Sequence, residues 1–148
     1  MKIKRLNRMF FIYLFLGGIF FLCINNSIIA QENKDRELNR LFIKIEDGLG
    51  SGSVDIFSGS FSNKNFLSLS SGNTGYYSAN QSYYVIKDFL SIHQPISFKF
   101  TNIVTETNNP FASGILRYNN KGIRGTAMVF VALQFIGNQW RISQITIN

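Results

Sequence analysis

This 148-residue sequence has only two prolines. It also has few residues that suit covalent or metal chemistry, with one cysteine and one histidine. The single cysteine, Cys23, excludes an intrachain disulfide. With only one histidine, His93, we expect no metal site and no cofactor. No Gly-x-Ser-x-Gly nucleophile motif occurs either. Charged residues make up only 16%, but a hydrophobic content of 45% excludes a disordered or fibrous chain.

The first 30 residues have the three-part layout of a secretory signal peptide. Four of the fifteen Lys and Arg fall in the first eight residues, an apolar run from Met9 to Ile24 follows, and Ala30 offers a small residue for cleavage. We therefore expect export to the periplasm or the outside, with membrane contact only through this segment before cleavage. Two alternatives stay open: an uncleaved anchor, and lipidation at Cys23, which the bulky residues before it disfavour.

The remaining residues predict one small domain. Residues 31–36 are polar and are expected to be a flexible start, and residues 37–148 form the domain, as a monomer or weak homodimer. After the signal, eleven Lys and Arg stand against eight Asp and Glu, a net charge of +3. So small an excess excludes nucleic acid as the expected partner, because a protein that binds nucleic acid should have a dominant basic face.

Periodicity and capping residues indicate helices. Apolar residues recur on one helical face over residues 37–49, and the glycine-rich residues 48–52 end this helix. Ser53 is expected to cap a short second helix. Ser78 and Gln81 have the spacing of a capping box, which opens a further helix.

After Pro95 the period changes to two, which indicates strands. Ile96, Phe98 and Phe100 alternate with polar residues and predict one buried face. The segment Ile123–Ile136 is apolar on both parities, which is typical of a central strand covered on both faces.

Three further segments complete the predicted strands. Phe66–Ser70 is a short strand before the capping box. Phe111–Tyr118 forms a hairpin with the apolar segment that follows it, around Asn119–Gly122. In the closing strand, Trp140–Ile147, a switch of parity indicates a bulge near Ser143-Gln144.

Helices gathered before an antiparallel meander indicate an α+β fold, with N-terminal helices packed on a strongly curved sheet. This order resembles the nuclear transport factor 2-like superfold, a cone around a cavity. Four segments, Tyr76–Gln81, Val85–Leu90, Pro95–Phe98 and Trp140–Ile145, are similar to the core of a family of small exported bacterial proteins, domain of unknown function family 4783. The resemblance implies the fold and transfers no catalytic residues, since the family has none assigned.

Aromatic residues make up 15% of the chain, which suggests an apolar ligand site. Six residues are candidates for lining a cleft between helix and sheet: Tyr83, Phe98, Phe100, Met128, Phe130 and Trp140. The alternative is that they fill the core, where each buried large side chain contributes about 1.5–3 kcal/mol. The expected partner is an unidentified small apolar ligand or an envelope protein.

The hairpin turn is a second candidate site. If Asn119–Gly122 sets the register, Arg117 lies opposite Arg124, and Lys121 at the tip completes a cationic fork. Facing like charges are unfavourable by roughly 0.2–1 kcal/mol, so we interpret the fork as a contact for an acidic partner or an anionic surface. The alternative is a solvated tip whose charges protect a sheet edge from aggregation.

Three functions are consistent with these patterns. The first is a noncatalytic binding or interaction module that holds a small apolar ligand or a partner protein at the concave sheet face. The second is a small cone-fold enzyme of the isomerase, dehydratase or hydrolase type, which needs a titratable group facing a cavity. His93 fits a helix C-terminal cation better than a base. The third is a structural envelope protein that pairs through its sheet face.

Overall fold

The computed structural model describes residues 31–148 of the chain. The expected signal peptide, its cleavage site and Cys23 lie outside the described residues. Residues 31–36 fall in a different compact unit from residues 37–148. They are helical, whereas the sequence predicts a flexible start. Two hydrogen bonds join side chains one helical turn apart: Gln31 donates to Asp35, and Arg36 donates to Glu32. Across the described residues, no helix is both long and apolar enough to span a bilayer.

In residues 37–51 the N-terminal helix buries its predicted apolar face. The buried residues are Leu38, Leu41, Phe42, Ile45 and Leu49. The helix ends within the predicted glycine-rich stretch, and a short helix, α2 (Asp55–Ser58), follows. The prediction that Ser53 caps α2 is wrong. The cap is Val54, without a side-chain bond, because the Ser53 N–H still bonds the Gly48 carbonyl at the end of the first helix.

The predicted capping box opens α3 (Ala79–Ile92). The Ser78 hydroxyl accepts a hydrogen bond from the Gln81 backbone N–H, and the Gln81 side chain accepts one from the Ser78 N–H. The apolar face of α3 packs into the core through Ile86, Phe89 and Leu90. The box therefore fixes where the helix starts, and burial fixes which face turns inward.

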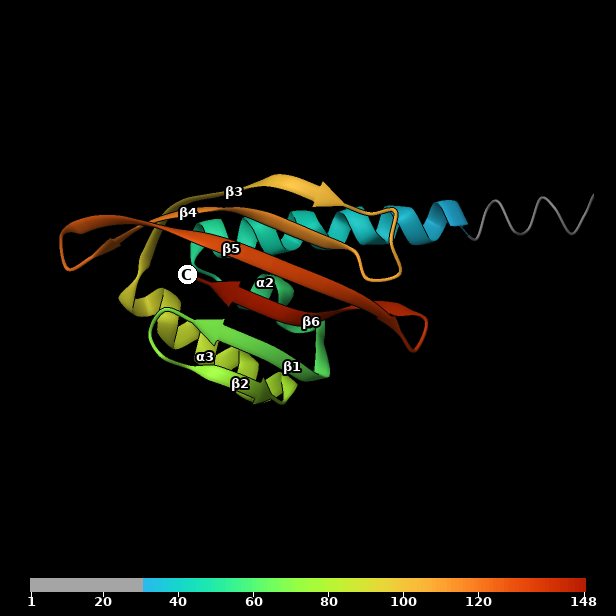
Figure 1. Ribbon diagram of the computed structural model, residues 1–148, viewed down its shortest axis with the longest axis horizontal. Coiled ribbons are helices and arrows are strands. Elements are labelled where there is room, and N and C mark those ends of the chain that lie inside the picture. The colour runs from blue at the N-terminus through green and yellow to red at the C-terminus, as the bar shows by residue number, and fades with distance from the viewer. Residues whose placement is uncertain (1–30) are drawn as a thin grey trace, which may run out of the picture. The chain divides into compact units, whose positions relative to one another are not determined.

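Six strands form one sheet in the order β2-β1-β6-β5-β4-β3 (Figure 1). Their bounds are β1 Phe61–Leu69, β2 Thr74–Tyr77, β3 Gln94–Val104, β4 Phe111–Asn120, β5 Ile123–Ile136 and β6 Gln139–Ile147. The sequence pattern misses β2, and β1 begins earlier than predicted. β1 pairs in parallel with β6, whereas all other neighbours are antiparallel, so the expected meander holds from β3 to β6.

The helices cover one face of this sheet (Figure 1), which we call the inner face; the opposite face is the outer face. The inner side chains of β5 are buried: Ala127, Val129, Val131 and Leu133. The position of β5 between β4 and β6 confirms that it is central. However, Met128 on its outer face is 54% exposed. The prediction that β5 is covered on both faces is therefore wrong, because no described helix lies over the outer face.

Edge strand β3 also departs from the simple alternation. Phe98 is buried as predicted and Phe100 partly so, but Ile96 is 53% exposed. The register of β3 against β4 shifts between Pro95 and Ser97, and such an irregularity re-aims the side chain beside it. The predicted inward position of Ile96 is therefore wrong.

The closing strand β6 contains the predicted bulge. Ala132 pairs with Gln144, whereas the next residue of β5, Leu133, pairs with Ile142. Ser143 is thus the extra residue on β6, and its hydroxyl donates to the Ala132 carbonyl at 3.1 Å. The bulge lets apolar residues on both sides of it face the core despite their change of parity.

Candidate functional site

The six residues expected to line an apolar cleft do not meet in one cleft. Four of them lie with the core on the inner side of the sheet: Tyr83, Phe98, Phe100 and Trp140. The other two, Met128 and Phe130, project from the outer face of β5. The sheet itself separates the two groups. The core-filling alternative describes the inner four, and the outer two belong to a different surface.

The β4–β5 hairpin turns at residues 121–122, both with positive φ, 51° and 88°. This is the pattern of a two-residue type I′ turn, whose twist matches that of the strands. The shorter turn shifts the register, so that Arg117 lies opposite Thr126 and Arg124 opposite Asn119. The predicted Arg117–Arg124 pair is therefore wrong. Both arginines still project from the same face, as diagonal neighbours.

These two arginines border one hollow on the outer face, which we call the hairpin pocket. It has a volume of about 410 Å³, and its walls are Ile96, Ser97, Arg117, Arg124, Gly125 and Thr126. Neither guanidinium has a hydrogen-bond or ion-pair partner within residues 31–148. Lys121 borders a neighbouring hollow of about 500 Å³, which it shares with Arg124. The structure thus brings the three predicted cations together at one end of the sheet.

The strands carry charge of one sign. Every charged side chain on the six strands is a cation: Lys64, Lys99, Arg117, Arg124 and Arg141. The acidic residues of the described chain lie on the helices and in the loop after β3. Counting charges over the predicted strands would have shown this bias from the sequence. An unpaired guanidinium binds carboxylates and phosphates through two parallel hydrogen bonds, so the surface suits an anionic partner.

Lys99 is the one strand cation with a carboxylate partner in the described residues. Glu46 of the N-terminal helix accepts hydrogen bonds from Lys99 Nζ and, at 2.8 Å, from the Phe100 backbone N–H. Burial alone would raise the pKa of Glu46, but these two hydrogen bonds outweigh it and lower the pKa. The same contact raises the pKa of Lys99. This pair fastens the helix to edge strand β3.

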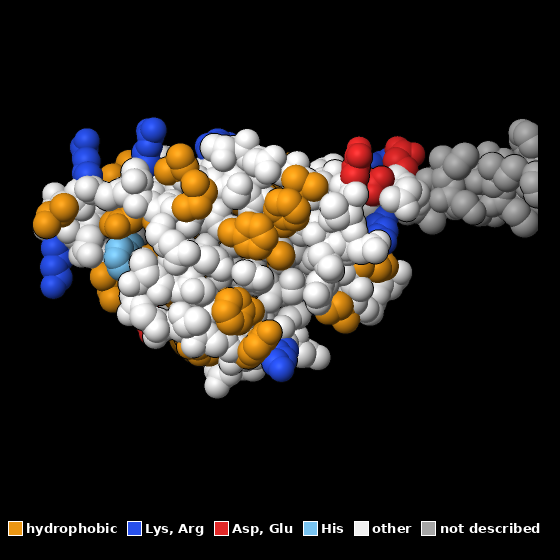
Figure 2. All heavy atoms as spheres, viewed as in Figure 1, with side chains coloured by type: hydrophobic (Ala, Val, Ile, Leu, Met, Phe, Trp, Pro, Cys, Tyr) orange, Lys and Arg blue, Asp and Glu red, His pale blue; other side chains and the backbone are white. Residues whose placement is uncertain are grey.

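An apolar strip runs over the middle of the outer face. Ile115 and Met128 pair across β4 and β5 and are 43% and 54% exposed. Beside them the rings of Phe111 and Phe130 stack with centroids 5.5 Å apart. Figure 2 shows hydrophobic side chains gathered over β4 and β5 on this face. We call these four residues the apolar strip.

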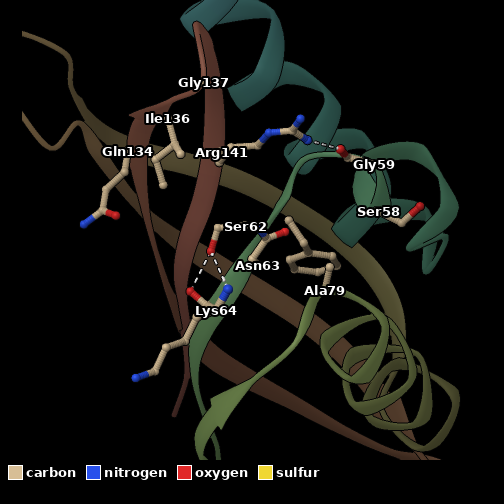
Figure 3. A pocket seen from close by; sticks show the side chains of 11 residues that line it. Ser58, Gly59, Ser62, Asn63, Lys64, Ala79, Gln134, Ile136, Gly137 and Arg141 are labelled. Carbon is tan, nitrogen blue, oxygen red and sulfur yellow. Dashed lines mark hydrogen bonds between the residues drawn. The ribbon is translucent and has the colours of Figure 1, made fainter.

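A larger pocket, of about 740 Å³, lies at the opposite end of β5, beside the β5–β6 turn (Figure 3). We call it the turn pocket. Two cations belong to its wall, Lys64 from β1 and Arg141 from β6. Arg141 donates to the Gly59 carbonyl and to Gln139 Oε1, each at 2.6 Å. Lys64 Nζ lies 4.4 Å from the centre of the Tyr76 ring. The sequence pattern missed this pocket because its walls come from distant segments.

Acid–base groups are scarce in these pockets. The walls of the hairpin pocket and the turn pocket hold no Asp, Glu or His. Residues 31–148 contain no group of three or more His, Cys, Asp or Glu arranged to hold a metal. His93 lies at the C-terminal end of α3, as the sequence predicts. Its ring stacks on Phe89 with centroids 4.3 Å apart and meets Tyr118 edge-on at 4.9 Å.

The fold recurs in solved structures. A DUF4783 family protein from Bacteroides ovatus ATCC 8483 is similar with a TM-score of 0.63 and 20% identity, over 70% of this chain and 90% of that one. Its counterpart from Bacteroides uniformis ATCC 8492 gives 0.64 and 19%, over 71% and 93%. An NTF-2 like protein of unknown function from Shewanella oneidensis MR-1 gives 0.54 and 13%, over 76% and 97%.

These likenesses show a nuclear transport factor 2-like cone fold, with helices packed on a curled six-stranded sheet. Comparison with curated proteins finds no match. The model of one family, described as Domain of unknown function (DUF4783), matches residues 42–148. That match takes in every strand and most of the core, and the chain therefore belongs to the DUF4783 family.

Proposed function

We propose that this protein is an exported, noncatalytic interaction module that binds an acidic protein partner through the outer face of its sheet. One observation carries the proposal: an exposed apolar strip and the two arginines Arg117 and Arg124 share this face, and no strand bears a carboxylate. The sequence favours a concave-face site instead. Core side chains and helices occupy that inner face, which is why the proposal moves to the outer one.

The apolar strip supplies affinity for such a partner. Interface centres are depleted in charge, and burying apolar area contributes about 25 cal/mol per Å². Met128 and Phe130 lie on β5 between Arg124, at the hairpin pocket, and Gln134, at the turn pocket. A partner that fits this face therefore has an apolar centre, with carboxylates on the side that meets the hairpin pocket.

The cations supply specificity. Arg117 and Arg124 each have five N–H donors, and neither is held by a carboxylate in the described chain. Each of them can therefore take a carboxylate of a partner through two parallel hydrogen bonds.

A second copy of this chain is a poor occupant of the same face. A two-fold dimer places the same patch of both copies together. It would then bring Arg117 and Arg124 of two copies onto one surface that has no strand carboxylate to offset them. Juxtaposed like charges oppose association. The charge pattern therefore favours a different protein of opposite sign.

Site-specific photo-crosslinking in the producing cell tests the proposal. We expect a photoreactive residue at Thr126, beside both arginines, to form an adduct with a protein of acidic composition. The variant Arg117→Gln/Arg124→Gln should lower the adduct yield about tenfold or more, since hydrogen bonds to charged groups contribute about 1.5–3 kcal/mol each. The same photoreactive residue at Ser91, exposed on α3, is the positional control.

A charge-matched control is Arg40→Gln/Lys44→Gln, which removes two cations from the N-terminal helix. It should leave the adduct at Thr126 unchanged. The proposal is wrong if Thr126 gives only adducts between copies of this chain, or if both double variants lower the yield equally. Equal adducts at Thr126 and Ser91 would also contradict it, because they would indicate contact without a preferred face.

A further inference from the structure

The turn pocket is assembled from four places in the chain. These are Ser58 and Gly59 at the end of α2, the start of β1 through Lys64, Ala79 in the first turn of α3, and residues at the β5–β6 turn (Figure 3). A volume of about 740 Å³ lies within the range of small-molecule sites. It shares no wall residue with the hairpin pocket, so the following inference is independent of the proposed function.

A buried polar network holds the β1 side of the pocket out of the sheet. β1 pairs with β6 at Phe61 and again only from Phe66, so residues 62–65 bulge from the ladder. The fully buried Asn65 fixes this bulge: its Oδ1 accepts from the Ser62 N–H at 3.0 Å, and its Nδ2 donates to the Ser62 carbonyl at 2.8 Å. The bulge presents Asn63 and Lys64 to the pocket.

The two cations of the pocket are held in place before any ligand binds. Arg141 uses two of its five N–H donors on Gly59 and Gln139, which leaves three for a ligand. Lys64 rests over the Tyr76 ring. In Figure 3 the two side chains extend in opposite directions, Arg141 toward Gly59 and Lys64 away from it.

Other features of the wall add positive potential and an apolar middle. Ala79 opens α3, whose first turn holds no acidic residue, and a helix N-terminus carries a partial positive charge. No Asp or Glu belongs to the wall. Phe61, Ala79 and Ile136 supply its apolar surface.

From this arrangement we infer that the turn pocket binds an elongated organic dianion, a molecule with carboxylates at its two ends and an apolar spacer between them. One carboxylate meets Arg141, and the other meets Lys64. The spacer lies against Phe61 and Ile136. A ligand with one anionic end leaves one of the two cations unused, and a cationic or purely apolar ligand leaves both unpaired.

Isothermal titration calorimetry of the full chain tests this inference with straight-chain dicarboxylates of four to twelve carbons, each against the monocarboxylate of equal length. We expect dicarboxylates to bind with an optimum of chain length, about tenfold or more tighter than the matched monocarboxylates, the factor expected for one charged hydrogen bond. The variant Lys64→Gln should remove this difference, because only the Arg141 end remains.

Lys87→Gln is the matched control, since Lys87 also lies over a tyrosine ring, that of Tyr83, but outside the pocket. It should bind like the unmodified chain, as should Arg117→Gln/Arg124→Gln, which separates this site from the outer-face contact. The inference is overturned if no dicarboxylate binds, if monocarboxylates bind equally well, or if Lys64→Gln changes nothing. Because Lys64 is exposed, its loss does not threaten the fold.

Discussion

Replacing Asn65 by alanine should destabilise the domain more than any surface change of the same size. Asn65 is fully buried, and its amide bonds the Ser62 N–H, the Ser62 carbonyl and, at 3.0 Å, the Ser82 hydroxyl. The substitution orphans these three groups. Each buried unsatisfied polar group costs about 1–3 kcal/mol, so the expected loss is about 3–5 kcal/mol once some relaxation is allowed.

Such a loss is large beside the total stability of a small domain, about 5–15 kcal/mol. Equilibrium unfolding in urea measures it, followed by the fluorescence of Trp140, the only tryptophan of the chain and a buried one. Asn63→Ala is the control, because Asn63 is an exposed amide two residues away and should change stability by less than about 0.5 kcal/mol.

A second substitution checks the reasoning on hydrogen bonds. Asn65→Asp keeps the acceptor for the Ser62 N–H but loses the donor toward the Ser62 carbonyl and Ser82, and near neutral pH it buries a carboxylate. It should therefore be at least as destabilising as alanine. A loss below about 1 kcal/mol for Asn65→Ala, or an Asp variant as stable as the original, would refute the account of the bulge.

Substitutions at three further positions test the same structure. Ser78→Ala should lower stability by about 0.5–2 kcal/mol, and Ser78→Gly by only a few tenths, as judged by thermal unfolding. Gly114→Ala should cost about 1–3 kcal/mol or displace β3, since a Cβ there would clash with the Lys99 carbonyl oxygen; amide exchange along β3 reports this. The pKa of Glu46 is lowered by folding, so its contribution is present above the unfolded pKa and lost as pH falls through the folded one. Glu46→Gln should flatten that part of the stability–pH curve, and an unchanged acid slope would contradict the pair with Lys99.

Local chemistry explains what the sequence predicted correctly. The capping box at Ser78 and Gln81 acts within one turn of chain, and the apolar face of residues 37–49 follows from helical periodicity alone. The bulge at Ser143 follows from a change in which alternate positions of the strand are apolar, because both sets can face the core only if an extra residue is inserted between them. Each of these features is encoded in a few adjacent residues.

What failed depends on groups far apart in the chain. The start of β1 does not alternate, because Asn65 in its bulge is held by Ser82, seventeen positions away. The hairpin register depended on whether two or four residues form the loop. The predicted loop was two residues too long, which placed Arg117 opposite Arg124 in place of Thr126 and left its face unchanged. The sequence could not show that Met128 is exposed. A strand with apolar residues on both faces has the same pattern whether a helix of the same chain or a separate binding partner covers its second face.

The strand cations have a simpler possible role, protection of sheet edges from aggregation, and their positions separate the two explanations. Lys99 lies on edge strand β3. Arg124 lies where β5 extends beyond its pairing with β6, which begins at Val129. Edge protection accounts for both. Arg117, however, pairs with Ser97 on one side and Thr126 on the other, so it protects no edge.

Arg117 is therefore the residue that distinguishes edge protection from recognition. Arg117→Gln leaves both edge cations in place, so light scattering on heating and storage should match that of the unmodified chain. The adduct formed at Thr126 should nevertheless fall, because half of the hairpin pocket's guanidinium groups are gone. If Arg117→Gln raises aggregation while the adduct at Thr126 persists, the charge on β4 serves solubility and the proposal that the outer face is a docking surface is wrong.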